Sequence, residues 1–73
     1  MIKILLRIVH AQKETREGKR IPYRVVSGAT GVNISVISDW MNNKVSLIRK
    51  DVLETFCRYY EVKPGDILVL EDN

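Results

Sequence analysis

The sequence predicts an all-α fold, a compact bundle of four to five short helices in a chain of 73 residues. Apolar residues recur at helical spacing in several separate segments. Residues that typically begin or end helices, such as Pro22, Gly31 and Asn33, fall between those segments. Hydrophobic residues make up 45% and charged residues 29% of the chain, as in ordinary globular proteins. The length indicates a single domain, residues 1–73.

The N-terminal segment changes its apolar period within a few residues. Residues 1–4 alternate as a strand does, and apolar residues from Leu5 onwards follow helical spacing. We therefore expect an extended start and a first helix from about residue 5 to 17, which Gly18 ends. Two alternatives stay open for the chain ends. Residues 1–4 pair with residues 68–70 as a two-stranded ribbon, within or between monomers, or these segments are helical too.

Residues 22–42 are predicted to form two short helices joined by a tight turn. Pro22 marks the start of the first helix, because its missing N–H would be unpaired there in any case. Gly31 ends that helix, since glycine enters the left-handed conformation without steric cost. The side chain of Asn33 is expected to cap the second helix, from about Ile34 to Met41.

The apolar pattern predicts that these two helices pack together. The inward positions are Val26, Val32, Ile37 and Trp40. Ser27 and Gly28 leave little bulk on the first helix, so we expect the second to cross it closely. Ser35 and Asp39 lie four residues apart and point away from Ile37. This outer face is therefore available to contact another molecule.

A further amphipathic helix is predicted from about Lys50 to Tyr60, with apolar residues at i, i+1, i+4, i+5 and i+8 from position 52. In the loop before it, Leu47 and Ile48 are expected to fold inward. Pro64 then begins a last short turn of helix, and Asp66 is favourably placed near its positive end.

The spacing of six residues resembles the helix-turn-helix of the Cro/phage-repressor type, also called the XRE type. In order, this motif has an apolar residue, a small residue, a glycine in the turn, a second apolar residue and two buried residues. In this sequence they are Val26, Ser27, Gly31, Val32, Ile37 and Trp40. The likeness continues through the helix around Leu53–Cys57 and the segment Val62–Leu68, and so covers the larger part of the chain. It implies a helix-turn-helix DNA-binding domain of the phage-repressor type, acting as a transcription regulator, for example a repressor on an operator.

The resemblance also implies which residues meet DNA, because the second helix of such motifs enters the major groove. The base-facing candidates are Asn33, Ile34, Ser35, Ser38 and Asp39. The phosphate-facing candidates are Tyr23, Arg24, Asn42, Asn43, Lys44, Arg49 and Lys50. The second helix contains no Arg, Lys or Gln, and Asp39 repels phosphate unless it accepts from cytosine or holds a basic side chain. We therefore expect shape and phosphate contacts to carry part of the recognition.

The charge is unevenly distributed along the chain. Residues 1–50 carry ten Lys or Arg and three Asp or Glu, a net charge of +7, whereas residues 51–73 carry two basic and six acidic residues, a net charge of −4. The basic part contains the predicted helix-turn-helix, as a phosphate-facing surface requires. The alternative is an ordinary solvated surface.

Catalysis, cofactors, metals and small-molecule substrates are not predicted. His10 and Cys57 are the only histidine and cysteine, which leaves no ligand set or catalytic set. His10 is expected to be an ordinary surface or boundary residue, and Cys57 a small buried hydrophobe. Lys3 and Arg7 interrupt the apolar N-terminus, which is shorter than the roughly 20 residues of a membrane span. We therefore expect a cytoplasmic location and no membrane partner.

Two function classes remain open. The first is a sequence-specific regulator of double-stranded DNA that binds as a homodimer, because one recognition helix reads too few bases. The alternative is an antitoxin-like or adaptor module on the same fold, in which exposed Ile34 and Val36 contact a protein partner.

Overall fold

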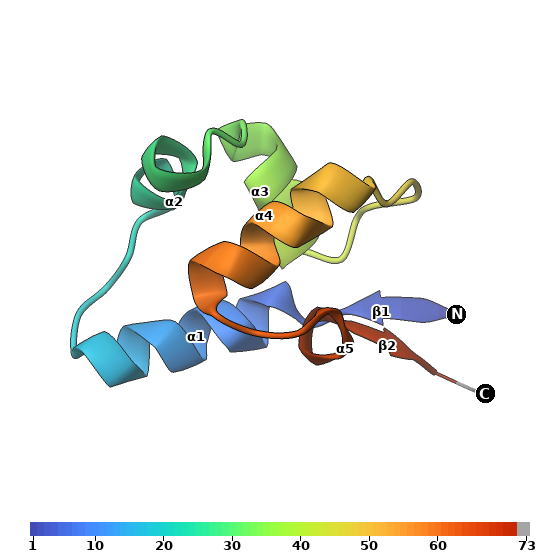
Figure 1. Cartoon of the computed structure of the whole chain (residues 1–73), viewed down its shortest axis with the longest axis horizontal. Coiled ribbons are helices and arrows are strands. Elements are labelled where there is room, and N and C mark those ends of the chain that lie inside the picture. The colour runs from blue at the N-terminus through green and yellow to red at the C-terminus, as the bar shows by residue number, and fades with distance from the viewer. Residues whose placement is uncertain (72–73) are drawn as a thin grey trace.

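The computed structural model describes residues 1–71, which form five helices and one two-stranded sheet (Figure 1). In chain order the elements are β1 (Ile2–Ile4), α1 (Leu6–Glu17), α2 (Tyr23–Thr30), α3 (Ile34–Met41), α4 (Lys50–Tyr60), α5 (Pro64–Ile67) and β2 (Leu68–Leu70). This arrangement confirms the predicted all-α bundle with its small terminal sheet. Among these residues, none of the helices has the length and apolar character that a membrane span needs.

The chain ends form the predicted ribbon within one monomer. β1 and β2 are antiparallel, with Ile2 opposite Leu70 and Ile4 opposite Leu68. The N–H of Leu5 donates to the carbonyl of Ile67 at 2.6 Å, which fixes the start of α1 against the end of α5. β1 and β2 therefore lie side by side at one end of the molecule (Figure 1).

The helix ends follow the predicted signals closely. Gly18 and Gly31 end α1 and α2 with φ of 66° and 76°, the left-handed conformation that glycine adopts readily. Asn43 also has a positive φ, 57°, just after α3. Pro22 is extended and precedes the first helical residue of α2, so it lies one position earlier than a proline of the first turn.

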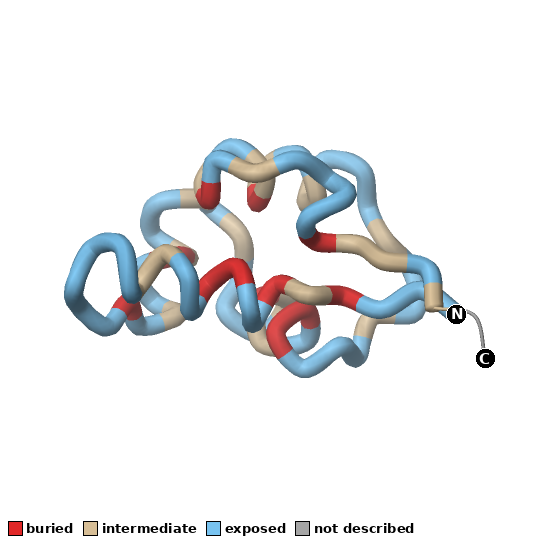
Figure 2. The backbone as a smooth tube through the Cα atoms, turned by 90° about the horizontal axis from the view of Figure 1, so that it is seen from below, coloured by how far each residue is buried: buried red, intermediate tan, exposed pale blue. Residues whose placement is uncertain are grey.

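The core draws side chains from β1, the segment between α1 and α2, and all five helices. Its buried apolar residues are Ile4, Leu6, Val9, Ile21, Val26, Ile37, Trp40, Met41, Phe56, Tyr60 and Ile67. Figure 2 shows the buried stretches of the different helices turned towards one shared interior. The rings of Trp40 and Phe56 lie 5.1 Å apart between centroids, which joins α3 to α4. Val32, predicted to be inward, is only partly buried against this core.

Two expectations about packing are wrong. Leu47 does not fold inward from the loop between α3 and α4, since 80% of it is exposed, whereas Ile48 does pack against the core. Gly28 is exposed, and a Cβ added there would meet no atom within 4 Å. The small residue at position 28 therefore does not serve a close crossing of α2 and α3.

Replacing Gly28 with alanine is expected to stabilise the protein by about 0.5–1 kcal/mol, because alanine has the higher helix propensity and open space surrounds the site. Gly31→Ala is the matched control. Its space is equally open, but its φ of 76° makes a side chain cost about 1–2 kcal/mol. Urea unfolding of both variants checks the pair, and equal effects of the two substitutions would contradict this assignment of the turn.

Candidate nucleic-acid interface

Asn33 sets the start of α3. Its side-chain oxygen accepts hydrogen bonds from the backbone N–H of Ser35 at 2.9 Å and from the Ser35 hydroxyl at 2.8 Å. This confirms the predicted cap, which satisfies an amide that the first helical turn leaves unpaired. Ile37 and Trp40, on the opposite side of the helix, are almost fully buried. The cap and these two anchors fix which face of α3 points outward.

The five predicted base-facing residues lie together at the start and along the outer side of α3. Asn33, Ser35 and Asp39 are exposed, Ser38 is half-buried, and 47% of Ile34 is exposed. No basic side chain of residues 1–71 forms an ion pair with Asp39. The face is thus polar and accessible, with a single uncompensated carboxylate.

The two asparagines after α3 are used within the fold. The Asn42 amide nitrogen donates to the Ser38 carbonyl at 2.8 Å, and its oxygen accepts from the guanidinium of Arg7 at 2.8 Å. The Asn43 oxygen accepts from the backbone N–H of Ile4 at 3.0 Å. These bonds tie the end of α3 to both α1 and β1, so they hold α3 against the rest of the structure.

The remaining phosphate-facing candidates are spread over α2, α4 and the loop between α3 and α4. Arg24, Lys44 and Lys50 are exposed, and Tyr23 is half-buried at the first position of α2. Arg49 lies 3.2 Å from the carboxylate of Asp51, with about 70% of each side chain exposed. Such an exposed pair contributes little to stability and leaves Arg49 able to exchange partners.

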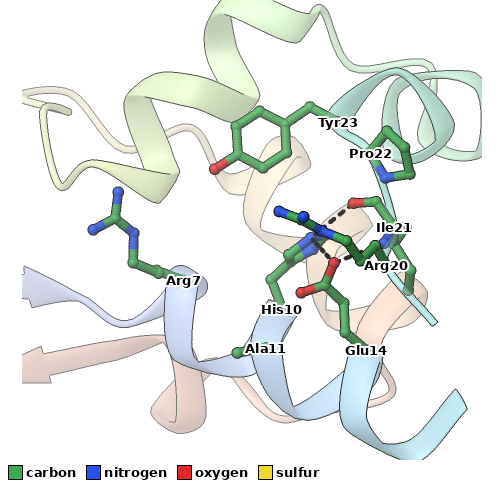
Figure 3. Close-up of a pocket in the computed structure, with 8 residues that line it drawn as sticks. All are labelled: Arg7, His10, Ala11, Glu14, Arg20, Ile21, Pro22 and Tyr23. Carbon is green, nitrogen blue, oxygen red and sulfur yellow. Dashed lines mark hydrogen bonds and ion pairs between the residues drawn. The ribbon is translucent and has the colours of Figure 1, made fainter. Parts of the chain in front are cut away.

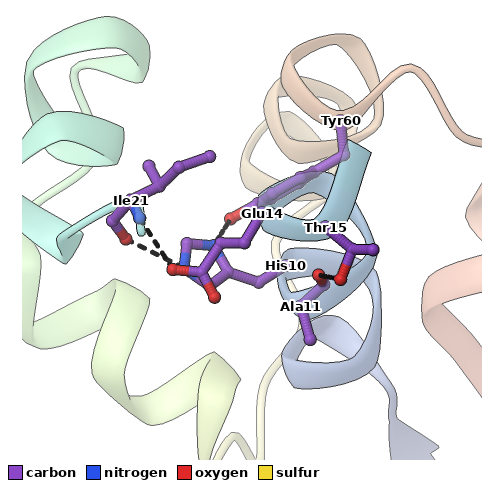
Figure 4. Close-up of polar contacts among 6 residues, drawn as sticks. All are labelled: His10, Ala11, Glu14, Thr15, Ile21 and Tyr60. Carbon is purple, nitrogen blue, oxygen red and sulfur yellow. Dashed lines mark hydrogen bonds and ion pairs between the residues drawn. The ribbon is translucent and has the colours of Figure 1, made fainter. Parts of the chain in front are cut away.

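A buried polar cluster positions the start of α2 (Figure 4). Nε2 of His10 lies 2.9 Å from the carbonyl of Ile21, and the Glu14 carboxylate accepts from the N–H of Ile21 at 2.7 Å. Because a carbonyl oxygen can only accept, Nε2 carries a proton. In the neutral imidazole, Nδ1 then accepts from the Tyr60 hydroxyl, 2.7 Å away. The side chains of His10 and Glu14 on α1 thus bond to the carbonyl and the N–H of Ile21, the residue before Pro22.

His10 was expected at the surface or its boundary, but the structure buries it, with 7% exposed. Its two ring nitrogens are both paired, which meets the requirement for a buried polar group. Burial also raises the pKa of Tyr60 far above its usual range, with smaller contributions from Tyr59, Tyr23 and Glu14. The Tyr60 hydroxyl therefore stays protonated and able to donate.

An open cavity of about 510 Å³ lies beside this cluster. It is bounded by α1, by the connection that joins α1 to α2, and by the start of α2. Figure 3 shows Arg7 at one side of the cavity, Arg20 in front of His10, and Tyr23 above them. The sequence did not single out Arg7, which is remote from the helix-turn-helix along the chain, or Arg20, which lies in the connection just before it. The only hint in the sequence is the basic run at residues 19–20 just before Pro22.

Within residues 1–71, no group of three His, Cys, Asp or Glu residues is placed to hold a metal ion. Cys57 is partly buried against the core, and this burial raises the pKa of its thiol. Cys57 thus packs against the core as a small side chain, but it is only partly buried where the sequence predicted a buried one.

Two short helices, a glycine turn and a capped second helix with an exposed polar face define a helix-turn-helix protein. The family model of the Cro/C1-type HTH DNA-binding domain matches residues 14–73, which include α2 to β2. The chain belongs to this family, and it is a DNA-binding protein of the transcription-regulator class. Comparison with curated proteins and with solved structures gave no match.

Proposed function

We propose that residues 1–73 act as one domain, a sequence-specific transcriptional regulator that docks α3 in the major groove of an operator. The observation that carries this proposal is the exposed polar face of α3, flanked by exposed basic residues at the start of α2 and after α3. The buried anchors Ile37 and Trp40 hold this face in a fixed orientation, which direct base readout requires. We place such a regulator in the cytoplasm.

The base contacts follow from the chemistry of each side chain. The oxygen of Asn33 is engaged in the cap, so its amide N–H groups are the part available to a base acceptor. Ile34 suits the methyl group of thymine, and Asp39 can accept from N4 of cytosine. Ser38 is a small hydroxyl donor, whereas the Ser35 hydroxyl already donates to Asn33 and offers its oxygen as an acceptor. Both small side chains tolerate several bases. Direct readout is therefore modest, and DNA shape supplies part of the specificity.

Phosphate contacts supply most of the affinity in this proposal. Arg24, Lys44 and Lys50 carry exposed charges around the ends of α2, α3 and α4. Tyr23, Arg7 and Arg20 face the cavity at the start of α2 and extend this surface. Arg49 joins this surface when its guanidinium exchanges the carboxylate of Asp51 for a phosphate. Asn42 and Asn43 contribute chiefly by holding the end of α3 in place.

Arg24→Ala and Lys44→Ala are each expected to weaken binding to every duplex sequence and to lower the salt slope by about one unit, as loss of one phosphate contact predicts. Lys63→Ala is the matched control, because Lys63 is exposed beside α5, across the molecule from α2 (Figure 1). Fluorescence anisotropy at several salt concentrations measures the slopes. Unchanged slopes for both Arg24→Ala and Lys44→Ala would contradict this docking.

One observation favours a second function, a protein-interaction module of the antitoxin or adaptor kind. Ile34 is apolar and half-exposed at the start of α3, within the proposed reading face, where a protein partner would cover it. Val36, the other residue expected to contact such a partner, packs partly against the core and contributes less. The substitution Ile34→Lys distinguishes the two functions. Its added positive charge is expected to strengthen DNA binding, because it attracts phosphate, and to weaken binding to an apolar protein surface.

A further inference from the structure

We propose that Glu14 is a positioning residue for DNA binding whose two properties act in opposite directions. Its hydrogen bond to Ile21 holds the start of α2 in the conformation that meets phosphate. Its negative charge repels the same phosphate and lowers the affinity. The Glu14→Gln protein is therefore expected to bind DNA more tightly than the wild type. This inference rests on the proposed DNA-binding function, because the cavity at the start of α2 must face the duplex.

Ile21 depends on side chains for both of its backbone hydrogen bonds. It lies between α1 and α2, outside the helices and strands, and only 5% of it is exposed. Its N–H donates to Oε2 of Glu14 at 2.7 Å, and its carbonyl accepts from Nε2 of His10 at 2.9 Å. Removal of the carboxylate leaves this part-buried N–H without a partner, which costs free energy. We expect the connection then to move, so that water reaches the N–H.

The start of α2 follows Ile21 through a stiff connection. Pro22 has a φ of −62°, which its ring fixes, and a proline also restricts the backbone of the residue before it. Tyr23 is the first residue of α2, and Arg24 is the second. A shift of Ile21 therefore moves these two side chains, which the proposed function places against phosphates. Through this connection, the bond from Glu14 controls where they lie.

The carboxylate of Glu14 also lies where phosphate is expected. It lines the open cavity together with Arg7, Arg20 and Tyr23 (Figure 3), and 29% of its side chain is exposed. In the part of the chain that the structure describes, no lysine or arginine pairs with it, and its Oε1 accepts no hydrogen bond. Only the His10 ring comes close, with Nε2 3.6 Å from Oε2. An uncompensated negative charge thus faces the approaching phosphate.

Glutamine at position 14 separates the two properties. Its amide oxygen accepts a hydrogen bond on a side chain of the same length, but the amide carries no charge. Alanine removes the charge and the acceptor together. Both substitutions change the net charge equally, so a purely electrostatic role predicts the same gain in affinity for both. A positioning role predicts that they differ, with the acceptor restored only by glutamine.

Fluorescence anisotropy with a duplex of mixed sequence measures both variants, because phosphate contacts act on every sequence. At low salt, Glu14→Gln is expected to lower the dissociation constant by about two- to fivefold, as loss of one nearby like charge predicts. This gain is expected to disappear at high salt, where exposed charges are screened. Glu14→Ala is expected to bind at least about threefold more weakly than Glu14→Gln at every salt concentration.

Glu54→Gln is the matched control, because it removes the same charge from a distant surface. Glu54 is exposed on α4, two residues from the buried Phe56. Two residues turn a helix by about 200°, so Glu54 points away from α3, against which Phe56 packs. The dissociation constant of this variant is expected to change by less than about 1.5-fold. Circular dichroism confirms that all variants are folded.

Amide hydrogen exchange of Ile21, followed by NMR without DNA, tests the hydrogen bond itself. Protection is expected to persist in Glu14→Gln and to fall at least about tenfold in Glu14→Ala. Equal affinities of these two variants, or no gain for Glu14→Gln at low salt, would overturn the proposal. A wild type that binds no duplex would contradict both the proposed function and the effect of the charge. Equal protection of Ile21 in all three proteins would contradict the positioning alone.

Discussion

Trp40→Ala is expected to lower the free energy of unfolding by about 3–5 kcal/mol, because it removes a large buried aromatic side chain and leaves a cavity. Only 2% of Trp40 is exposed, and its ring packs against Phe56 across the junction of α3 and α4. A chain of 73 residues has little stability to lose. Urea unfolding followed by circular dichroism measures the change.

Leu47→Ala is the control for this substitution, since it also removes a large apolar side chain but from a position that is 80% exposed. Its effect is expected to stay within about 0.5 kcal/mol. Near-native stability of Trp40→Ala would show that α3 is oriented differently, with Trp40 outside the core. The face assigned to DNA would then be wrong as well.

Tyr60→Phe is expected to destabilise the protein by about 1–3 kcal/mol, because it leaves Nδ1 of the buried His10 without a hydrogen-bond partner. The change removes a single oxygen and keeps the ring, so packing loss is small. Thermal or urea unfolding of the variant measures the effect. Since His10 also holds Ile21, we expect looser positioning of the start of α2.

Tyr59→Phe is the matched control, because Tyr59 is the neighbouring tyrosine on α4 and its ring packs edge-on against Tyr60. Tyr59 is only partly buried, so loss of its hydroxyl is expected to cost less than about 0.5 kcal/mol. Equal losses for the two variants would mean that the hydrogen bond to His10 contributes nothing to stability.

The sequence predicted the fold where local chemistry decides it. Gly31 and Asn33 fixed the turn and the cap, and the apolar period placed α4 at the observed residues. The ribbon was one of two alternatives, because pairing of residues 2–4 with 68–70 depends on how the helices bring the chain ends together. Leu47 was misplaced because apolar character alone does not show which loop residues reach the core.

The features of the site that depend on residues close in sequence could be predicted, but contacts between distant segments could not. The exposed face of α3 follows from the positions of Ile37 and Trp40, which local periodicity reveals. The cluster of His10, Ile21 and Tyr60 joins three distant segments and leaves no local signal. The same holds for Arg7, whose bond to Asn42 depends on the packing of α1 beside the end of α3. Such contacts require the tertiary structure.

Selection from a randomised duplex pool, followed by salt titration of the selected sequence, tests the central claim most directly. A sequence-specific dimeric regulator is expected to enrich a palindrome and to lose affinity steeply as salt rises, because phosphate contacts release counterions. Salt-sensitive binding without an enriched motif, or no binding at all, would contradict sequence-specific regulation. Either result would favour the protein-interaction module, with Ile34 at the start of α3 as part of its surface.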